Sequence, residues 1–132
     1  MGDRLFDDPG TRELLTVLTV QQPWASLLIS GRKDIENRSW NTRHRGLLVI
    51  HAAKRIDRDA PSELFEMIGD FPLGALVGSV TVEDVVLDSP SIWARPGSFH
   101  WVLGESSMIE PVPMSGKVSL WSLPEQYRHL FV

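Results

Sequence analysis

The stretch GRKDIENRSW, residues 31–40, contains five charged side chains, and three of them are spaced as a candidate site. Lys33, Glu36 and Arg38 are residue types that handle anions and protons. A lysine beside a carboxylate can hold a phosphate as an ammonium group or, when desolvated, act as a base, while the carboxylate orients the lysine or activates water. Alternating acids and bases are also common in solvated cross-strand ion pairs, and the pattern alone favours that interpretation over a site.

Five tryptophans are candidates for stacking on a nucleobase beside such cations. Stacking of one base on an aromatic ring contributes about 1–3 kcal/mol. Trp24 falls on an apolar helical stripe and Trp121 on a predicted strand, so both are expected in the core. Trp40 adjoins a polar turn and Trp93 lies in a loop rich in proline and glycine. These two are therefore the better candidates for stacking.

Histidine is the remaining candidate for acid–base chemistry. His51 stands at the end of an apolar run, where it can transfer protons or simply cap its neighbours through hydrogen bonds, and the second role is favoured. The histidines lack the close spacing of a preformed metal site, so we predict neither a metal nor another cofactor. The sequence also contains no G-x-S-x-G elbow, phosphate-binding G-x-x-x-x-G-K loop or dinucleotide fingerprint.

The basic residues are concentrated in a fifth of the chain. Residues 32–58 contain eight bases and three acids, a net charge of +5, although the whole chain has a net charge of -4. Such a distribution can present a basic patch on an acidic body and attract an anionic ligand to one face. A loop region solvated by arginines explains the charge equally well.

Length and composition indicate one compact domain, because 132 residues with 42% hydrophobic and 23% charged side chains are typical of an ordinary globular core. The absence of cysteine excludes disulfides, a thiolate nucleophile and a zinc finger. No apolar run is long enough to cross a bilayer, and the first residues lack the basic flank and apolar core of a secretory signal. We therefore expect a cytoplasmic protein without membrane contact.

Short strands and short helices alternate along the chain. An apolar, β-branched run at residues 14–20 predicts a buried strand. Pro23 and Gly31 then mark the start and the end of a helix of about two turns. After this helix the pattern changes to period two, and one face of the extended segment carries Asp34, Glu36, Arg38 and Trp40.

The rest of the pattern predicts strands over 47–53, 74–88, 98–103 and 117–123, and short helices over 61–70 and 124–131. Gly78, inside the longest strand, indicates a bulge or a sharp bend. Crossover helices between successive parallel strands are missing, so we expect an α+β fold, a small mixed and partly closed β-barrel with flanking short helices. The domain is expected over residues 14–132, after an N-terminal extension at 1–13.

The motif QPWASLL at residues 22–28 is followed by G-x-K-x-x-E-x-R-x-W at 31–40, by Arg45-Gly46 and by LLVIHAA. Together these segments closely resemble the ASCH domain, the activating signal cointegrator homology domain. The similarity continues through GALVGSVTVEDVV and PMSGKVSLW and spans most of residues 15–123. The resemblance implies a PUA-like β-barrel with a cleft beside it, in a superfamily associated with RNA binding, RNA modification, transcription-coupled regulation and DNA binding.

By this analogy the cleft is lined by the helix after the first strand and by the G-x-K-x-x-E-x-R segment, which reverses the preference for a solvated ion pair. The implied residues are Gln22, Pro23, Trp24, Ser26, Lys33, Glu36 and Arg38, with Arg45 and His51 nearby. Our leading hypothesis is a basic cleft that binds RNA or another single-stranded nucleic acid, a nucleotide or a modified base. In this hypothesis the phosphate contacts Lys33, Arg38 and Arg45, and the base stacks on Trp40 or Trp24. Glu36 either accepts a hydrogen bond from an amino group of the base or orients Lys33.

Two alternatives stay open. The resemblance also implies a small hydrolase, either a ribonuclease or an amidohydrolase that deacylates a modified cytidine and uses Lys-x-x-Thr where this chain has Lys33 and Glu36. In that case the catalytic residues would be Lys33, Glu36 and His51, with Arg38 in a phosphate clamp. The other alternative is a protein-interaction or transcription-coregulator domain.

Overall fold

The computed structural model describes residues 13–132, so the expected N-terminal extension lies outside the described residues apart from Glu13. The elements follow in the order β1 (Thr16–Gln22), α2 (Trp24–Ile29), β2 (Ile35–Arg38), β3 (Gly46–Ile56), α3 (Ser62–Ile68), β4 (Ala75–Val86), β5 (Phe99–Pro113), β6 (Leu120–Ser122) and η1, a 3-10 helix (Glu125–Leu130). Among these residues, no helix is long and apolar enough to span a membrane.

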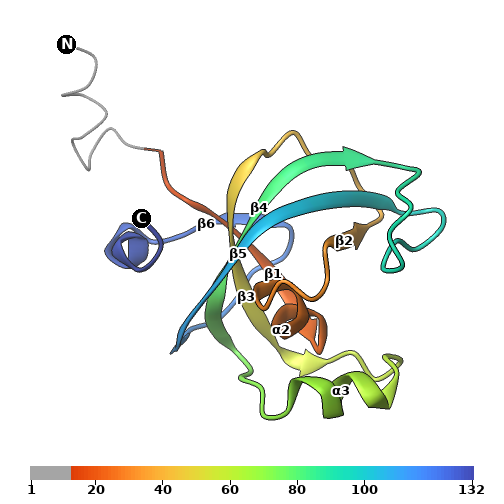
Figure 1. Ribbon diagram of the computed structural model, residues 1–132. Helices are drawn as coiled ribbons and strands as arrows, with labels where there is room; N and C mark the ends of the chain where they lie inside the picture. Colours follow the sequence, from red (N-terminus) through yellow and green to blue (C-terminus); the bar gives the residue numbers. More distant parts are fainter. Residues whose placement is uncertain (1–12) are drawn as a thin grey trace.

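All six strands form one mixed sheet in the order β2-β5-β4-β3-β1-β6, which confirms the α+β class with short helices (Figure 1). β1 pairs in parallel with β3, and the other pairs are antiparallel. The sheet curls but does not close into a barrel, because its edge strands β2 and β6 are only four and three residues long and do not pair with each other. A side-chain bond reaches across the opening instead, from Arg38 Nη2 of β2 to the Thr19 carbonyl of β1 at 3.1 Å.

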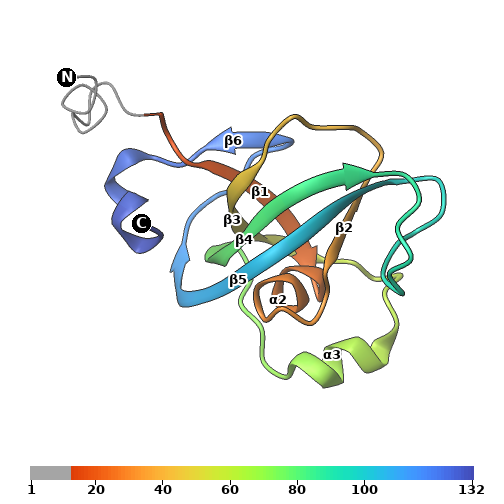
Figure 2. The same ribbon diagram turned by 45° about the horizontal axis from the view of Figure 1, so that its top comes forward.

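The curled sheet wraps around α2, drawn in orange in Figure 2, which contacts β1, β3, β4 and β5. The helix buries Ala25, Leu27, Leu28 and Ile29, and all of these except Leu27 belong to the inner core, the apolar cluster enclosed by the curled sheet. Each fully buried leucine contributes about 1.5–3 kcal/mol. The predicted start at Pro23 and stop near Gly31 are confirmed, since Pro23 is the N-cap and Gly31 has a φ of +79°.

A second, smaller core covers the opposite face of the sheet. Side chains alternate along β1 and β3, so Val17 and Val49 point to this face while Leu18 and Ile50 point to the inner core. Leu123, Tyr127 of η1 and Phe131, which follows η1, complete the second core. The C-terminal segment therefore closes the face that α2 leaves uncovered.

The bend predicted at Gly78 is present as a register shift between Leu76 and Gly78 in the pairing of β4 with β5. The predicted length of β5 is wrong: a strand was expected only at 98–103, whereas β5 extends to Pro113. Residues 104–113 lack apolar alternation and are mostly exposed, so the local sequence does not indicate a strand there. Their extended conformation follows from pairing with the long strand β4.

Candidate functional site

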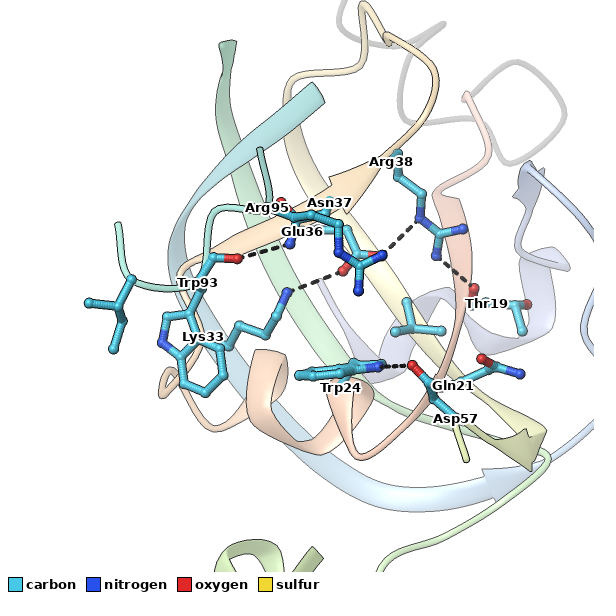
Figure 3. A pocket seen from close by; sticks show the side chains of 12 residues that line it. Thr19, Gln21, Trp24, Lys33, Glu36, Asn37, Arg38, Asp57, Trp93 and Arg95 are labelled. Carbon is cyan, nitrogen blue, oxygen red and sulfur yellow. Dashed lines mark hydrogen bonds and ion pairs between the residues drawn. The ribbon is translucent and has the colours of Figure 1, made fainter. Parts of the chain in front are cut away.

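A pocket of about 380 Å³ opens where the end of β1, α2, β2 and the loop before β5 meet (Figure 3). Its walls combine cations, carboxylates and two indoles, and they come from segments far apart in the sequence. The lining residues are Thr19, Val20, Gln21, Trp24, Lys33, Glu36, Asn37, Arg38, Asp57, Ile92, Trp93 and Arg95.

Lys33 and Glu36 form a buried ion pair at the inner end of the pocket. Their exposed fractions are 4% and 6%, and Lys33 Nζ lies 3.6 Å from Glu36 Oε1. Lys33 Nζ also donates a hydrogen bond to the Ile35 carbonyl. Burial lowers the pKa of Lys33, the Glu36 carboxylate opposes that shift, and the charge of Arg38 adds to it. The interpretation as a solvated surface pair is therefore wrong.

Arg38 extends this pair into a row of three charged groups. Its Nε donates to Glu36 Oε2 at 2.8 Å, and its Nη2 donates to the Thr19 carbonyl. Glu36 thus accepts from a cation on each side, as the dashed lines in Figure 3 show. Glu36 and Arg38 contact each other and both line the pocket, whereas Asp34 and Trp40, predicted on the same face, do not line it.

The Trp24 indole forms one side of the pocket, below Lys33 in the view of Figure 3. Its Nε1 donates to Asp57 Oδ2 at 2.8 Å, and Lys33 Nζ lies 5.5 Å from the ring centroid, within range of a cation–π interaction. The backbone N–H of Asp57 is itself bonded to the Gln22 carbonyl at 2.8 Å, so the carboxylate is held in place. Trp24 packs against the inner core with part of its surface and lines the pocket with another part.

The loop between β4 and β5 supplies Ile92, Trp93 and Arg95 to the pocket. Arg95 is exposed, and among the described residues no hydrogen bond or ion pair engages its guanidinium group. Trp93, one of the two stacking candidates outside the predicted core, is half-buried with its indole beside Lys33 (Figure 3).

Comparison with known proteins agrees with this architecture. A model of the ASCH domain family matches residues 18–112. The chain belongs to the ASCH domain family.

Activating signal cointegrator 1 from Homo sapiens is 35% identical to this ASCH domain over 126 residues, and its counterpart from Mus musculus is 32% identical over 128. Both alignments cover 80% of this chain but only 22% of the relative, so the chain spans about a fifth of those proteins. A crystal structure of a ZmASCH mutant from Zymomonas mobilis superposes with a TM-score of 0.60 at 16% identity, over 89% of this chain and 96% of that one. The crystal structure of ASCH from the same organism superposes with a TM-score of 0.58 at 16% sequence identity, over 86% of this chain and 90% of that one. These structures support the fold alone.

Three of the predicted cleft residues build the start of α2 rather than line the pocket of the ASCH domain. Gln22 is fully buried, and its side chain accepts from the Ser26 N–H at 3.0 Å and donates to the Pro72 carbonyl at 3.1 Å. Pro23 is buried beneath the helix start. Ser26 faces a different hollow, between α2 and β5.

Trp40 and Arg45 also lie outside the pocket lining. Trp40 packs edge-on against Trp101 at a centroid distance of 4.9 Å and joins the inner core, because the chain turns away from β5 after Arg38. Arg45 is exposed on the turn before β3, where its Nη2 lies 3.6 Å from Asp84.

The structure separates His51 from Lys33 and Glu36. His51 lies on the face of the second core, with Nδ1 3.2 Å from Thr19 Oγ1 and Nε2 donating to the Met114 carbonyl at 2.7 Å. Burial lowers its pKa; the bond to Met114 opposes the shift, and the charge of Lys54 adds to it. The favoured prediction of a hydrogen-bonding role fits this position, and His51 does not line the pocket with the two proposed catalytic partners.

Sequence reasoning missed seven pocket residues: Thr19, Val20, Gln21, Asn37, Asp57, Ile92 and Arg95. Arg95 had a usable signal, since it is the one base in the loop SPSIWARPGS and stands two residues from Trp93. Asp57 lies next to three bases and was counted only as a charge. Among residues 13–132, no three histidine or acidic side chains cluster in a way that would hold a metal ion.

Proposed function

We propose that this ASCH domain binds an unpaired nucleotide of RNA, or of another single-stranded nucleic acid, in the pocket beside α2. The observation that carries the proposal is one pocket containing an indole surface, Trp24, together with the cations Lys33, Arg38 and Arg95. The family is PUA-like and is proposed to bind RNA. Proteins recognise single-stranded RNA by splaying out a base, stacking it on an aromatic ring and holding the phosphate with cations.

The charges of the pocket favour an anion at its mouth. Glu36 is already paired with Lys33 and Arg38, and Asp57 accepts from Trp24 and from the Asp59 backbone N–H. The exposed guanidinium of Arg95 faces the opening beside this neutralised interior (Figure 3). We therefore assign the phosphate contact to Arg95, with Arg38 next to it.

The indole surfaces favour a planar ligand. Trp24 and Trp93 line the same pocket, and Trp24 is held in orientation by Asp57. A volume of about 380 Å³ lies within the usual range for small-molecule sites, roughly 300–1,000 Å³. A base stacked on Trp24 would place its edge toward Lys33 and Glu36, the deepest polar groups. Of the two expected stacking surfaces, Trp40 and Trp24, we therefore retain Trp24, because Trp40 does not line the pocket.

The test compares the wild-type protein with Arg95→Ala. Binding of a fluorescein-labelled single-stranded oligoribonucleotide is measured by fluorescence anisotropy over a range of salt concentrations. Loss of one phosphate contact should weaken binding at low salt and reduce the slope of log K against log [salt] by about 0.7. Arg43→Ala is the matched control, because Arg43 is exposed and does not line the pocket. Wild-type protein that fails to bind the oligonucleotide at low salt would contradict the proposal.

A second candidate function is hydrolysis of an acylated nucleoside or of RNA, and the observation that favours it is the lowered pKa of Lys33 beside Glu36. Buried lysines of this kind serve as bases in enzymes. Incubation with N4-acylcytidines and with labelled RNA, next to Glu36→Gln, separates turnover from binding. Retention of the oligonucleotide without any turnover would leave the binding module as the function.

A protein-interaction role as a coregulator domain rests only on the similarity to activating signal cointegrator 1, of which this chain covers 22%. Such a role predicts a partner that still binds after the oligonucleotide has filled the pocket or after Arg95→Ala. Loss of partner binding together with nucleic-acid binding would instead assign both to one site.

A further inference from the structure

The loop at residues 89–95, which carries Trp93 and Arg95 into the pocket, is held by side chains of two neighbouring strands. Asn37 of β2 and His100 of β5 are direct partners in the antiparallel ladder. Directly opposed residues project from the same face of a sheet, so these two side chains lie next to each other. Both make hydrogen bonds to the loop rather than to each other.

The Asn37 amide grips the loop backbone at two points. Its Nδ2 donates to the Trp93 carbonyl at 2.9 Å, a bond drawn in Figure 3, and its Oδ1 accepts from the Arg95 N–H at 2.9 Å. One planar group therefore uses its donor and its acceptor on the two sides of Ala94. Rotation of the backbone at this point would break both bonds.

His100 of β5 also bonds to this loop, and its side chain is only 3% exposed. Its Nδ1 accepts from the Ser89 N–H at 3.3 Å, and its Nε2 bonds to the Arg95 carbonyl at 2.7 Å. A backbone N–H only donates and a carbonyl only accepts, so in these two bonds Nδ1 accepts and Nε2 donates. His100 thus ties the first and the last residues of the loop to β5.

Ser91 adds a third attachment. Its hydroxyl donates to Asp34 Oδ1 at 2.6 Å and accepts from the Trp93 N–H at 3.1 Å. Together, Asn37 and Ser91 engage both the N–H and the carbonyl of Trp93. These contacts hold the loop as a fixed wall of the pocket.

We propose that Asn37 and His100 are positioning residues, which hold the 89–95 loop so that Trp93 and Arg95 face the pocket before a ligand arrives. The ligand-binding part of this inference rests on the proposed function. A preformed wall lowers the entropic cost of binding, because the two side chains need not be ordered by the ligand. Asn37 itself lines the pocket, so the test must separate an indirect role from direct contact.

The first measurement is amide hydrogen exchange by NMR on the whole chain, which needs no ligand. Asn37→Ala should raise the exchange rate of the Arg95 amide by about tenfold or more, since a bond that protects it is lost. Ser91→Ala, a smaller change outside the core, should do the same for the Trp93 amide. Asn41→Ala is the matched control, because Asn41 is exposed and, within residues 13–132, its side chain bonds only the adjacent Thr42 N–H. Unchanged exchange at Arg95 and Trp93 would overturn the positioning role.

The second measurement is oligoribonucleotide affinity in a double-mutant cycle. Asn37→Ala should weaken binding about fivefold or more in the wild-type background, but by less than about twofold in a Trp93→Ala/Arg95→Ala background, because a positioning residue acts through those side chains. An equal loss in both backgrounds would show direct contact by Asn37 and overturn the inference. If the wild-type protein binds no oligonucleotide, the proposed function fails, while the exchange rates still decide whether the loop is held.

Discussion

Lys33, Glu36 and Arg38 form a row in which the carboxylate is shared by two cations. Taking charges out of water costs several kcal/mol per ion, and attraction offsets that cost only when hydrogen bonds complete the network. Here Glu36 accepts from Arg38 at 2.8 Å, and Lys33 has the Ile35 carbonyl as a further acceptor. These three side chains therefore help to hold the pocket wall together, and they are also candidates for contact with a ligand.

Removal of Glu36 should be costly, because it leaves the buried Lys33 ammonium without its counter-charge. We expect Glu36→Met to lower the free energy of unfolding by about 3 kcal/mol or more, measured by urea denaturation. The double variant Lys33→Met/Glu36→Met should lose clearly less than the sum of the two single variants. Strict additivity would mean that the two side chains do not stabilise each other.

The bend of β4 at Gly78 shapes the inner core. A β-carbon at this position would lie 2.1 Å from the Ser107 carbonyl oxygen and 3.0 Å from Ile29 Cγ2, so strand β5 and helix α2 both approach the bare backbone. Helix α2 therefore approaches β4 closely at a residue that has no side chain.

Gly78→Ala should consequently destabilise the fold by about 1–3 kcal/mol through overpacking. The control is Ser107→Ala, an exposed change on the paired strand that should stay within about 0.5 kcal/mol of the wild type. Thermal and urea unfolding of both variants checks this. If Gly78→Ala unfolds at the same temperature and urea concentration as the wild type, β5 can shift away from the new methyl group without loss of stability.

Across the whole molecule, β1 connects the two faces of the sheet. The Thr19 carbonyl accepts from Arg38 at the pocket, while its hydroxyl lies 3.2 Å from His51 Nδ1 and accepts from Trp121 Nε1 at 3.1 Å. Gly116 closes over this cluster, where a β-carbon would meet His51 at 2.6 Å. The second core therefore adjoins a histidine whose pKa is lowered by burial.

Because burial lowers the pKa of His51 below its usual value of about 6.5, the unfolded chain binds a proton on this ring more readily than the native protein does. The contribution of His51 to stability is complete about one pH unit above 6.5 and declines as the pH falls through 6.5 toward the native pKa. The free energy of unfolding should drop between about pH 7.5 and pH 5.5, and drop less in His51→Gln. His129→Gln, at an exposed histidine, should keep the wild-type profile. An identical drop in all three proteins would assign the effect to other groups.

Local patterns in the chain were enough to predict α2 between Pro23 and Gly31, the strand before it and the bend at Gly78, because capping, periodicity and glycine geometry act over a few residues. The motif G-x-K-x-x-E-x-R likewise pointed to Lys33, Glu36 and Arg38 as candidates. Whether the Lys33–Glu36 ion pair is buried or solvated depends on neighbouring elements that local patterns do not specify.

Long-range packing set the rest. Trp24 is oriented by Asp57, and Trp93 is held by Asn37 across 56 positions of sequence. The basic segment at 32–58 does not act as one patch, since Arg38 enters the pocket while Arg45 pairs with Asp84 elsewhere. Strand alternation puts His51 on the face of Val49, and tertiary packing makes that face the one covered by the second core rather than the one at the pocket. Pocket membership depends on which strands pair and how the sheet curls, and both follow from tertiary packing rather than from the spacing of residues along the chain.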